Sequence, residues 1–142
     1  MLWNYGIAYQ DQLSQESSDL LLYFLVLPMC WHSKTLSSVS STRTSSGLGK
    51  LCEKLGSERE ELLAIHERAL RLRTATLRSV AFGVRAGLFY VEYREGKLRA
   101  VSSKAVPKNA RIEEHFRGAR KLGAWFQKLE TVHIFRALQV EA

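Results

Sequence analysis

The sequence has few of the residues from which small proteins build cross-links or metal centres. Cys30 and Cys52 are its only cysteines, they lie in or beside hydrophobic segments, and they show no CxxC spacing. A disulfide framework and a zinc site are both disfavoured, because each needs several cysteines or histidines at a defined spacing. We therefore expect two reduced thiols and a cytoplasmic protein.

Long hydrophobic runs are also missing. The most apolar stretch, residues 20–29, has roughly half the length that a bilayer-spanning helix needs. Acidic residues rather than basic ones precede it, which is the wrong order for a secretion signal. The segment is predicted to be a buried core helix, and no membrane association is expected.

Patterns that support catalysis are equally scarce. Gly47-Leu48-Gly49-Lys50 lacks both the spacing and the preceding strand of a phosphate-binding loop. The neighbours in Glu113-Glu114-His115 diverge by about 100° on a helix and cannot converge on one substrate. No two histidines have the spacing of a metal-binding helix; they are His32, His66, His115 and His133. We expect no enzymatic activity, no metal, no cofactor and no small-molecule substrate.

What the chain does have is positive charge. Its 142 residues suffice for one domain, and 21 lysines and arginines against 14 acidic residues give a net charge of +7. Such a surplus favours an anionic partner, which can be nucleic acid or an acidic protein surface. Charge alone does not separate the two.

The first half of the chain predicts two helices and two less regular segments. Residues 1–15 alternate aromatic and smaller side chains, as a short strand or an aromatic anchoring arm would. A helix is expected over residues 18–37, kinked at Pro28. A serine-rich loop should follow over residues 37–47, and a short amphipathic helix over residues 48–55.

The longest predicted element is a helix over residues 57–86. Ser57 and Glu60 have the spacing of a capping box, and His66 and Arg73 fall on its apolar side. Its opposite face is acidic in the first half and carries arginines seven residues apart in the second. The expected core stripe consists of Leu62, Leu63, Ala69, Leu70, Leu77, Val80, Ala81 and Val84, and the basic row of Arg71, Arg78 and Arg85.

After this helix the pattern changes to that of strands. Residues 88–93 and 98–101 predict a hairpin with its turn at Glu95-Gly96. A helix capped by Asn109 should cover residues 110–129, and a last helix residues 130–138, with Val132, Phe135 and Leu138 inward. Within the former, Gly123 allows close helix approach. Trp125 lies off the main apolar face and is either a partner-interface anchor or a core residue.

Together these elements predict a mainly α protein with a small β-hairpin, a single α+β domain over residues 1–142. A hairpin that follows a helix directly is the order of a winged helix-turn-helix, with residues 1–15 as an N-terminal arm and residues 109–142 as a C-terminal helical extension. In such a domain the helix and the wing contact phosphates or a partner. The candidate contacts are Arg71, Arg78, Arg85, Arg94, Lys97 and Arg99.

Three segments resemble one protein family. Leu25-Val26-Leu27-Pro28, followed by His32 and Lys34, resembles the opening helix of the middle components of bacterial three-component ABC-ATPase conflict systems, of which Lamassu-like systems are one group. The arginine-rich helix that runs into Gly87-Leu88-Phe89 is similar to theirs. The block from Ala119 to Phe126 resembles their terminal Leu-Gly-x-Trp-Phe motif. The Asn-Pro common near the start of such proteins is absent, so no role carries over to residues 1–15.

The resemblance implies a non-catalytic accessory subunit of an anti-phage or anti-plasmid defence complex. It would bridge an SMC-like or Rad50-like ABC ATPase and an effector such as a nuclease, and would restrain the effector until the ATPase engages foreign DNA. The alternative is a stand-alone winged-helix transcription regulator that binds DNA as a homodimer. A third possibility, a small RNA-associated or ribosome-associated protein, is supported by the positive charge alone.

Overall fold

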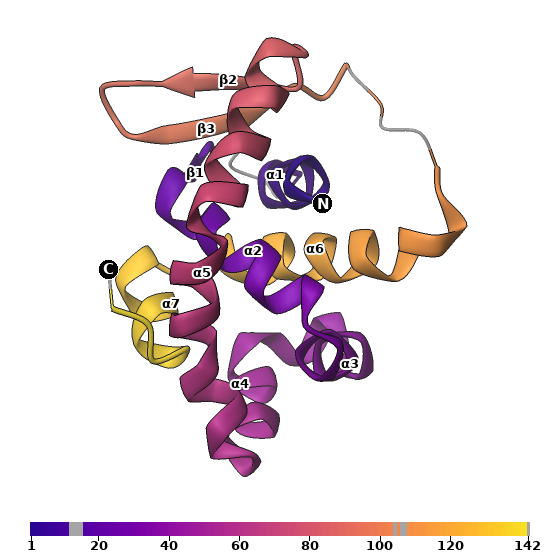
Figure 1. Cartoon of the computed structure of the whole chain (residues 1–142), viewed down its shortest axis with the longest axis vertical. Coiled ribbons are helices and arrows are strands. Elements are labelled where there is room, and N and C mark those ends of the chain that lie inside the picture. The colour runs from indigo at the N-terminus through magenta and orange to yellow at the C-terminus, as the bar shows by residue number, and fades with distance from the viewer. Residues whose placement is uncertain (12–15, 104, 106–107, 142) are drawn as a thin grey trace.

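The structure is a computed structural model that describes residues 1–11, 16–103, 105 and 108–141. It is mainly helical with one small antiparallel sheet, which confirms the predicted α+β class (Figure 1). The elements are α1 (Leu2–Gln10), β1 (Ser18–Asp19), α2 (Leu20–Trp31), α3 (Ser33–Ser41), η1 (Thr44–Ser46), α4 (Gly47–Ser57), α5 (Arg59–Arg85), β2 (Phe89–Glu92), β3 (Lys97–Ala100), η2 (Ala110–Ile112), α6 (Glu113–Phe126) and α7 (Thr131–Ala137).

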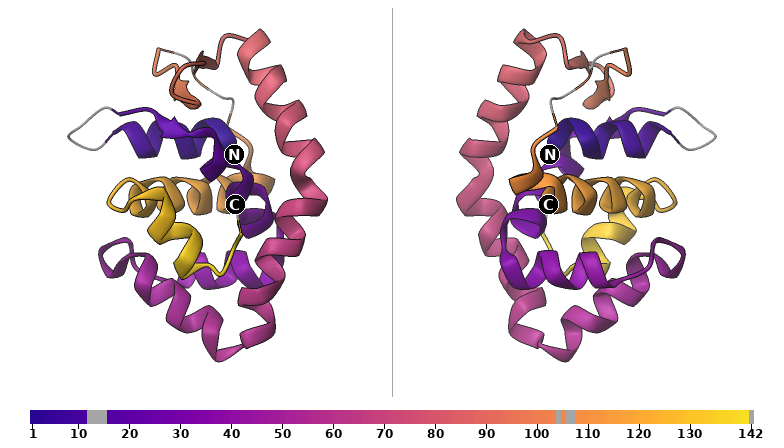
Figure 2. Two further views of the ribbon diagram at one scale, coloured as in Figure 1. Left: turned by 90° about the vertical axis from the view of Figure 1, so that its left-hand side faces the viewer. Right: turned by 90° about the vertical axis from the view of Figure 1, so that its right-hand side faces the viewer.

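The N-terminal segment is a core helix, so the expected strand or anchoring arm is wrong. Helix α1 lies between α6 and strand β3 (Figures 1 and 2). Tyr5 is fully buried, and its ring centroid lies 4.8 Å from that of Tyr23 and 6.0 Å from that of Phe126. Because α1 is covered on two sides, its aromatic residues do not show the one-sided period of a surface helix. Residues 12–15 of the expected arm lie outside the described residues.

The hydrophobic segment forms a core helix, as predicted. Leu22, Leu25 and Met29 of α2 are completely buried. The chain bends at His32, whose backbone is extended (φ −86°, ψ 121°), whereas Pro28 lies inside α2. The single helix predicted to residue 37 is therefore wrong, and so is the start of the loop, since α3 continues to Ser41. The break lets α2 pack on α5 while α3 packs on α6.

Helices α4 and α5 match the two predicted helices. The predicted capping box is wrong, because Ser57 Oγ donates to the Lys54 carbonyl oxygen at 2.7 Å and so closes α4. The N-cap of α5 is Glu58, which makes no side-chain cap bond. The buried side of α5 consists of Leu62, Ile65, Ala69, Thr76, Val80 and Gly83.

The predicted hairpin is present, and a third strand extends it. Strand β3 lies between β2 and β1, with Leu98 opposite Val91 on one side and opposite Ser18 on the other. Phe89 packs so close to Gly83 of α5 that a Cβ atom there would lie 2.5 Å from its ring. The hairpin is thereby fixed to the last turns of α5.

The C-terminal helices close the core. Asn109 Oδ1 accepts a hydrogen bond from the backbone N–H of Arg111 at 3.0 Å, which confirms Asn109 as a cap, here of η2. Trp125 is 1 % exposed and its Nε1 donates to the Thr44 carbonyl oxygen at 2.8 Å. It is a core residue rather than a surface anchor. In α7 Ile134 is buried and Val132 is half exposed, so the inward placement of Val132 is wrong.

Candidate protein and nucleic-acid interface

The solvent side of α5 is apolar along one line. The helix runs along one edge of the molecule, and no other described element covers its outer side (Figure 2). Leu63, Leu70 and Leu77 are 47 %, 59 % and 42 % exposed. Their predicted place in the core is wrong. Residues seven apart recur on nearly one side of a helix, and this side lies beside the buried stripe rather than on it.

A line of charged side chains runs next to these leucines. The candidate residues Arg71, Arg78 and Arg85 are all exposed, as predicted for a solvated face. Arg71 lies 3.4 Å from the carboxylate of Glu67 one turn earlier, an exposed pair that stabilises little. For Arg78 and Arg85 there is no ion pair with any residue in the described ranges. This face is therefore acidic in its first half and basic in its second.

A mostly apolar groove of about 450 Å³ adjoins the exposed leucines. Leu70 lies on its rim with 59 % exposure. His66, which the sequence placed on the apolar side of the helix, is half-buried, and its Nδ1 accepts from the backbone N–H of Glu141 at 3.3 Å. Arg73 is exposed. The lining comes from α2, α5, α7 and the C-terminal segment: Leu21, Phe24, Leu25, His66, Ala69, Leu70, Arg73, Phe135, Val140 and Glu141.

The three basic residues of the hairpin lie in different surroundings. Arg99 lies inside β3, and its Nε is 3.3 Å from Glu92 Oε1. Lys97 is opposite Glu92 in the sheet register and opposite Asp19 on its other side. Arg94 is exposed in the turn and has no ion pair with any residue that the structure describes. Of the three, Arg99 is paired with a carboxylate, Lys97 lies opposite two acidic residues, and Arg94 makes no ion pair with a described residue.

Exposed aromatic residues accompany Arg94, and the sequence reasoning missed them. Tyr93 in the turn is 86 % exposed, and Tyr90 on the outer face of β2 is 64 % exposed. The alternation of β2 was the available signal, because Phe89 faces the core and its neighbour must therefore face outward. An arginine beside exposed tyrosines suits stacking on bases or packing on a protein.

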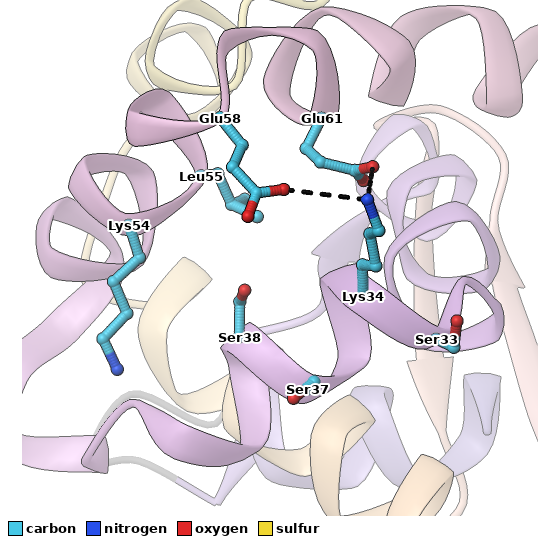
Figure 3. A pocket seen from close by; sticks show the side chains of 8 residues that line it. All are labelled: Ser33, Lys34, Ser37, Ser38, Lys54, Leu55, Glu58 and Glu61. Carbon is cyan, nitrogen blue, oxygen red and sulfur yellow. Dashed lines mark ion pairs between the residues drawn. The ribbon is translucent and has the colours of Figure 1, made fainter.

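A second hollow, of about 380 Å³, lies where α3 meets the corner between α4 and α5 (Figure 3). Lys34 points into it, with its Nζ 3.9 Å from Glu58 and 3.8 Å from Glu61. Glu61 also lies 3.4 Å from His32 and 3.7 Å from Arg68. These ion pairs attach the break between α2 and α3 to the first turns of α5. The arrangement supports the fold, because its charges are directed at one another rather than at a ligand.

The two free cysteine thiols are held in their protonated, unreactive form. Burial raises the pKa of the free Cys30 thiol to about 12 and that of the free Cys52 thiol to about 11. Both thiols are protonated at neutral pH and are poor nucleophiles. Within the described ranges, no three His, Cys, Asp or Glu residues are placed to hold a metal ion. In the same ranges, no helix has the length and apolarity to cross a bilayer.

The structure is that of a small, mainly helical α+β protein. Exposed leucines, tyrosines and arginines lie on one face of α5 and on the hairpin. Over residues 1–142 the sequence matches the family described as ABC-three component (ABC-3C) system Middle Component 3, and the chain belongs to that family. The resemblance noted from the sequence is thereby confirmed. Comparison with curated proteins gives no match, and neither does comparison with solved structures.

Proposed function

We propose that this middle component is a non-catalytic accessory subunit that bridges an SMC-like ABC ATPase and an effector such as a nuclease. It would hold the effector inactive until the ATPase engages foreign DNA. The observation that carries the proposal is the family match over the whole chain, because a component of a three-component system acts through the other two.

The arrangement of the exposed residues supports a bridge. A bridging subunit needs two separate contact surfaces, and the fold offers two candidates. One is the groove lined by α2, α5, α7 and the C-terminal segment, and the other is the hairpin beyond the end of α5 (Figure 1). Helix α5 has 27 residues and at 1.5 Å per residue is about 40 Å long. Two partners can therefore bind without overlapping.

We propose that the six basic positions contact DNA or a partner polypeptide within the complex. Arg94 is the strongest candidate for DNA, since it makes no ion pair with any described residue and the hairpin also exposes Tyr90 and Tyr93. Arg71, Arg78 and Arg85 border exposed leucines, a mixture that fits a polypeptide better than a phosphate backbone.

The second candidate function is a stand-alone winged-helix regulator. The observation that favours it is a hairpin that follows α5 directly and forms a three-stranded sheet with β1. It ranks second because α5 would have to enter the major groove, and the first half of its exposed face carries Glu60 and Glu67. Carboxylates there repel phosphates.

The proposal is tested by co-expressing the chain with the ATPase and effector of its own system and purifying through a tag on this subunit. We expect all three to elute together, and we expect the effector to be active without DNA only when this subunit is left out. Elution of the tagged chain alone, or an effector that needs DNA equally with and without it, would contradict the bridge and the restraint respectively.

A single substitution in the hairpin tests its contribution to DNA binding separately from assembly of the complex. Arg94→Glu should weaken DNA binding by the purified complex and lower the slope of log affinity against log salt by about one, as expected for one lost phosphate contact. The control is Arg111→Glu, the same charge change at an exposed position in η2. Equal salt slopes for the two variants would exclude Arg94 as a DNA contact.

A further inference from the structure

The exposed leucines of α5 have the spacing of a coiled-coil seam. Leu63, Leu70 and Leu77 repeat every seven residues, and Thr74 and Ala81 lie four residues after the second and third of them. Positions separated alternately by four and three residues form one stripe that a second helix can cover. All five residues are exposed, so the stripe is uncovered in the single chain.

The charges beside this seam reverse sign in the middle of the helix. Glu60 and Glu67 lie in its first half, and Arg78 and Arg85 in its second, while Arg71, near the midpoint, lies 3.4 Å from Glu67 of its own helix. Two copies side by side in the same direction would place arginines against arginines. Two copies in opposite directions place the acidic half of one against the basic half of the other. In a symmetric pair of this kind the acidic and the basic half of each helix both meet opposite charge, and both copies use the same surface.

We propose that α5 is a dimerisation helix, which pairs antiparallel with α5 of a second copy of this chain. In the register symmetric about residue 72, Leu63 faces Ala81 of the second copy and Leu70 faces its Thr74. In the third layer Leu77 of one copy faces Glu67 of the other. The carboxylate of this Glu67 then lies beside Arg78 of the copy that contributes Leu77. The same register brings Glu60 beside Arg85, so both carboxylates gain an arginine.

The charge pattern of α5 favours a second copy of this chain rather than a helix of another protein as the partner. A helix of another protein would need a basic first half and an acidic second half to match α5 in parallel, or the reverse in antiparallel orientation. The α5 sequence already has the antiparallel pattern. The inference goes beyond the proposed bridge, because it concerns two copies of the middle component. It uses the line of exposed leucines on α5 and leaves the hairpin and the groove walls formed by α2 and α7 free for the other two components.

A charge exchange in the purified chain tests the pairing. The wild-type protein should show a concentration-dependent dimer in analytical ultracentrifugation. Glu67→Arg and Arg78→Glu should each weaken the dimer about tenfold or more, because each places like charges together. The double variant, with both substitutions, should return to within about threefold of wild type, since the pairs re-form with exchanged signs. Arg111→Glu is the matched control and should leave the dimer unchanged.

Cross-linking tests the direction. In a Cys52→Ser background, Leu63→Cys and Ala81→Cys proteins should form a disulfide only when mixed. In the antiparallel pair each engineered cysteine lies 18 residues, or about 27 Å, from its own symmetry mate. In a parallel pair each protein would cross-link with itself.

The outcomes are distinct. A chain that stays monomeric up to its solubility limit overturns the proposal. So does a dimer that ignores the Glu67 and Arg78 substitutions, or cross-links that form within each protein alone. None of these results affects the three-component purification, and failure of that purification leaves the dimer measurement intact.

Discussion

A close approach of two helices in this fold predicts a steep effect of one methyl group. Gly123 of α6 faces the backbone of α1, where a Cβ atom would lie 2.9 Å from the Tyr9 nitrogen and would overlap the Tyr5 carbonyl oxygen. Backbone atoms of a packed helix cannot move aside as a flexible side chain can. Gly123→Ala must therefore push α1 away from α6 along a well-packed contact.

The size of the effect follows from two opposing terms. Overpacking of this kind costs about 1–3 kcal/mol or more, whereas alanine in a helix gains roughly 0.5–1 kcal/mol over glycine. The free energy of unfolding should fall by about 1–2 kcal/mol, which for a chain of this length lowers Tm by about 3–8 °C. Thermal unfolding followed by circular dichroism measures it.

Two other glycines complete the series. A Cβ atom added at Gly49 in α4 would have no other atom within 4 Å. Gly49→Ala should therefore raise the free energy of unfolding by roughly 0.5 kcal/mol. For Gly118 the nearest atom is Leu36 Cδ1 at 2.8 Å, the end of a side chain that can rotate, so Gly118→Ala should fall between the other two. A Gly123→Ala protein as stable as the Gly49→Ala protein would refute the reasoning.

Two further predictions concern buried groups. Trp125→Phe removes the hydrogen bond to the Thr44 carbonyl oxygen and some buried volume, so urea unfolding should show a loss of about 2–3 kcal/mol; an unchanged stability with impaired complex assembly would make Trp125 a partner contact after all. Burial raises the Cys30 pKa from 9.0 to about 12, so above pH 9 the unfolded chain loses a proton that the folded chain keeps, and stability falls as pH rises. Cys30→Ala should flatten the decline in urea unfolding between neutral pH and about pH 10, and an equal slope would show that the thiol does not contribute.

The sequence predicted the elements whose signals are local. The hairpin follows from its aromatic strands and Glu95-Gly96 turn, and the core helix over residues 20–29 from uninterrupted hydrophobicity. The close approach at Gly123 was also predicted from residue type, although residue type does not suffice, because Gly49 within α4 has no close neighbour.

The missed features depend on contacts between distant segments. Strand β1 has two residues, and only its pairing with β3 defines it. The break at His32 exists because the apolar α2 and the serine-rich α3 pack on different helices. On α5, hydrophobic spacing alone did not distinguish the covered stripe of Leu62 from the exposed line of Leu63, since the two residues are neighbours. Which line faces the core is decided by where α2 lies.

The burial of α1 also bears on how the chain is made. Trp3 Nε1 donates to the carbonyl oxygen of Val101, 98 positions further on, and Tyr5 lies against α6 near the other end of the chain. Synthesis on the ribosome runs from the N-terminal to the C-terminal side, so the aromatic side chains of α1 stay uncovered until β3 and α6 have emerged. We expect an aggregation-prone interval during which a chaperone could cover α1, and a chain truncated before α6 would lack the surface on which α1 packs.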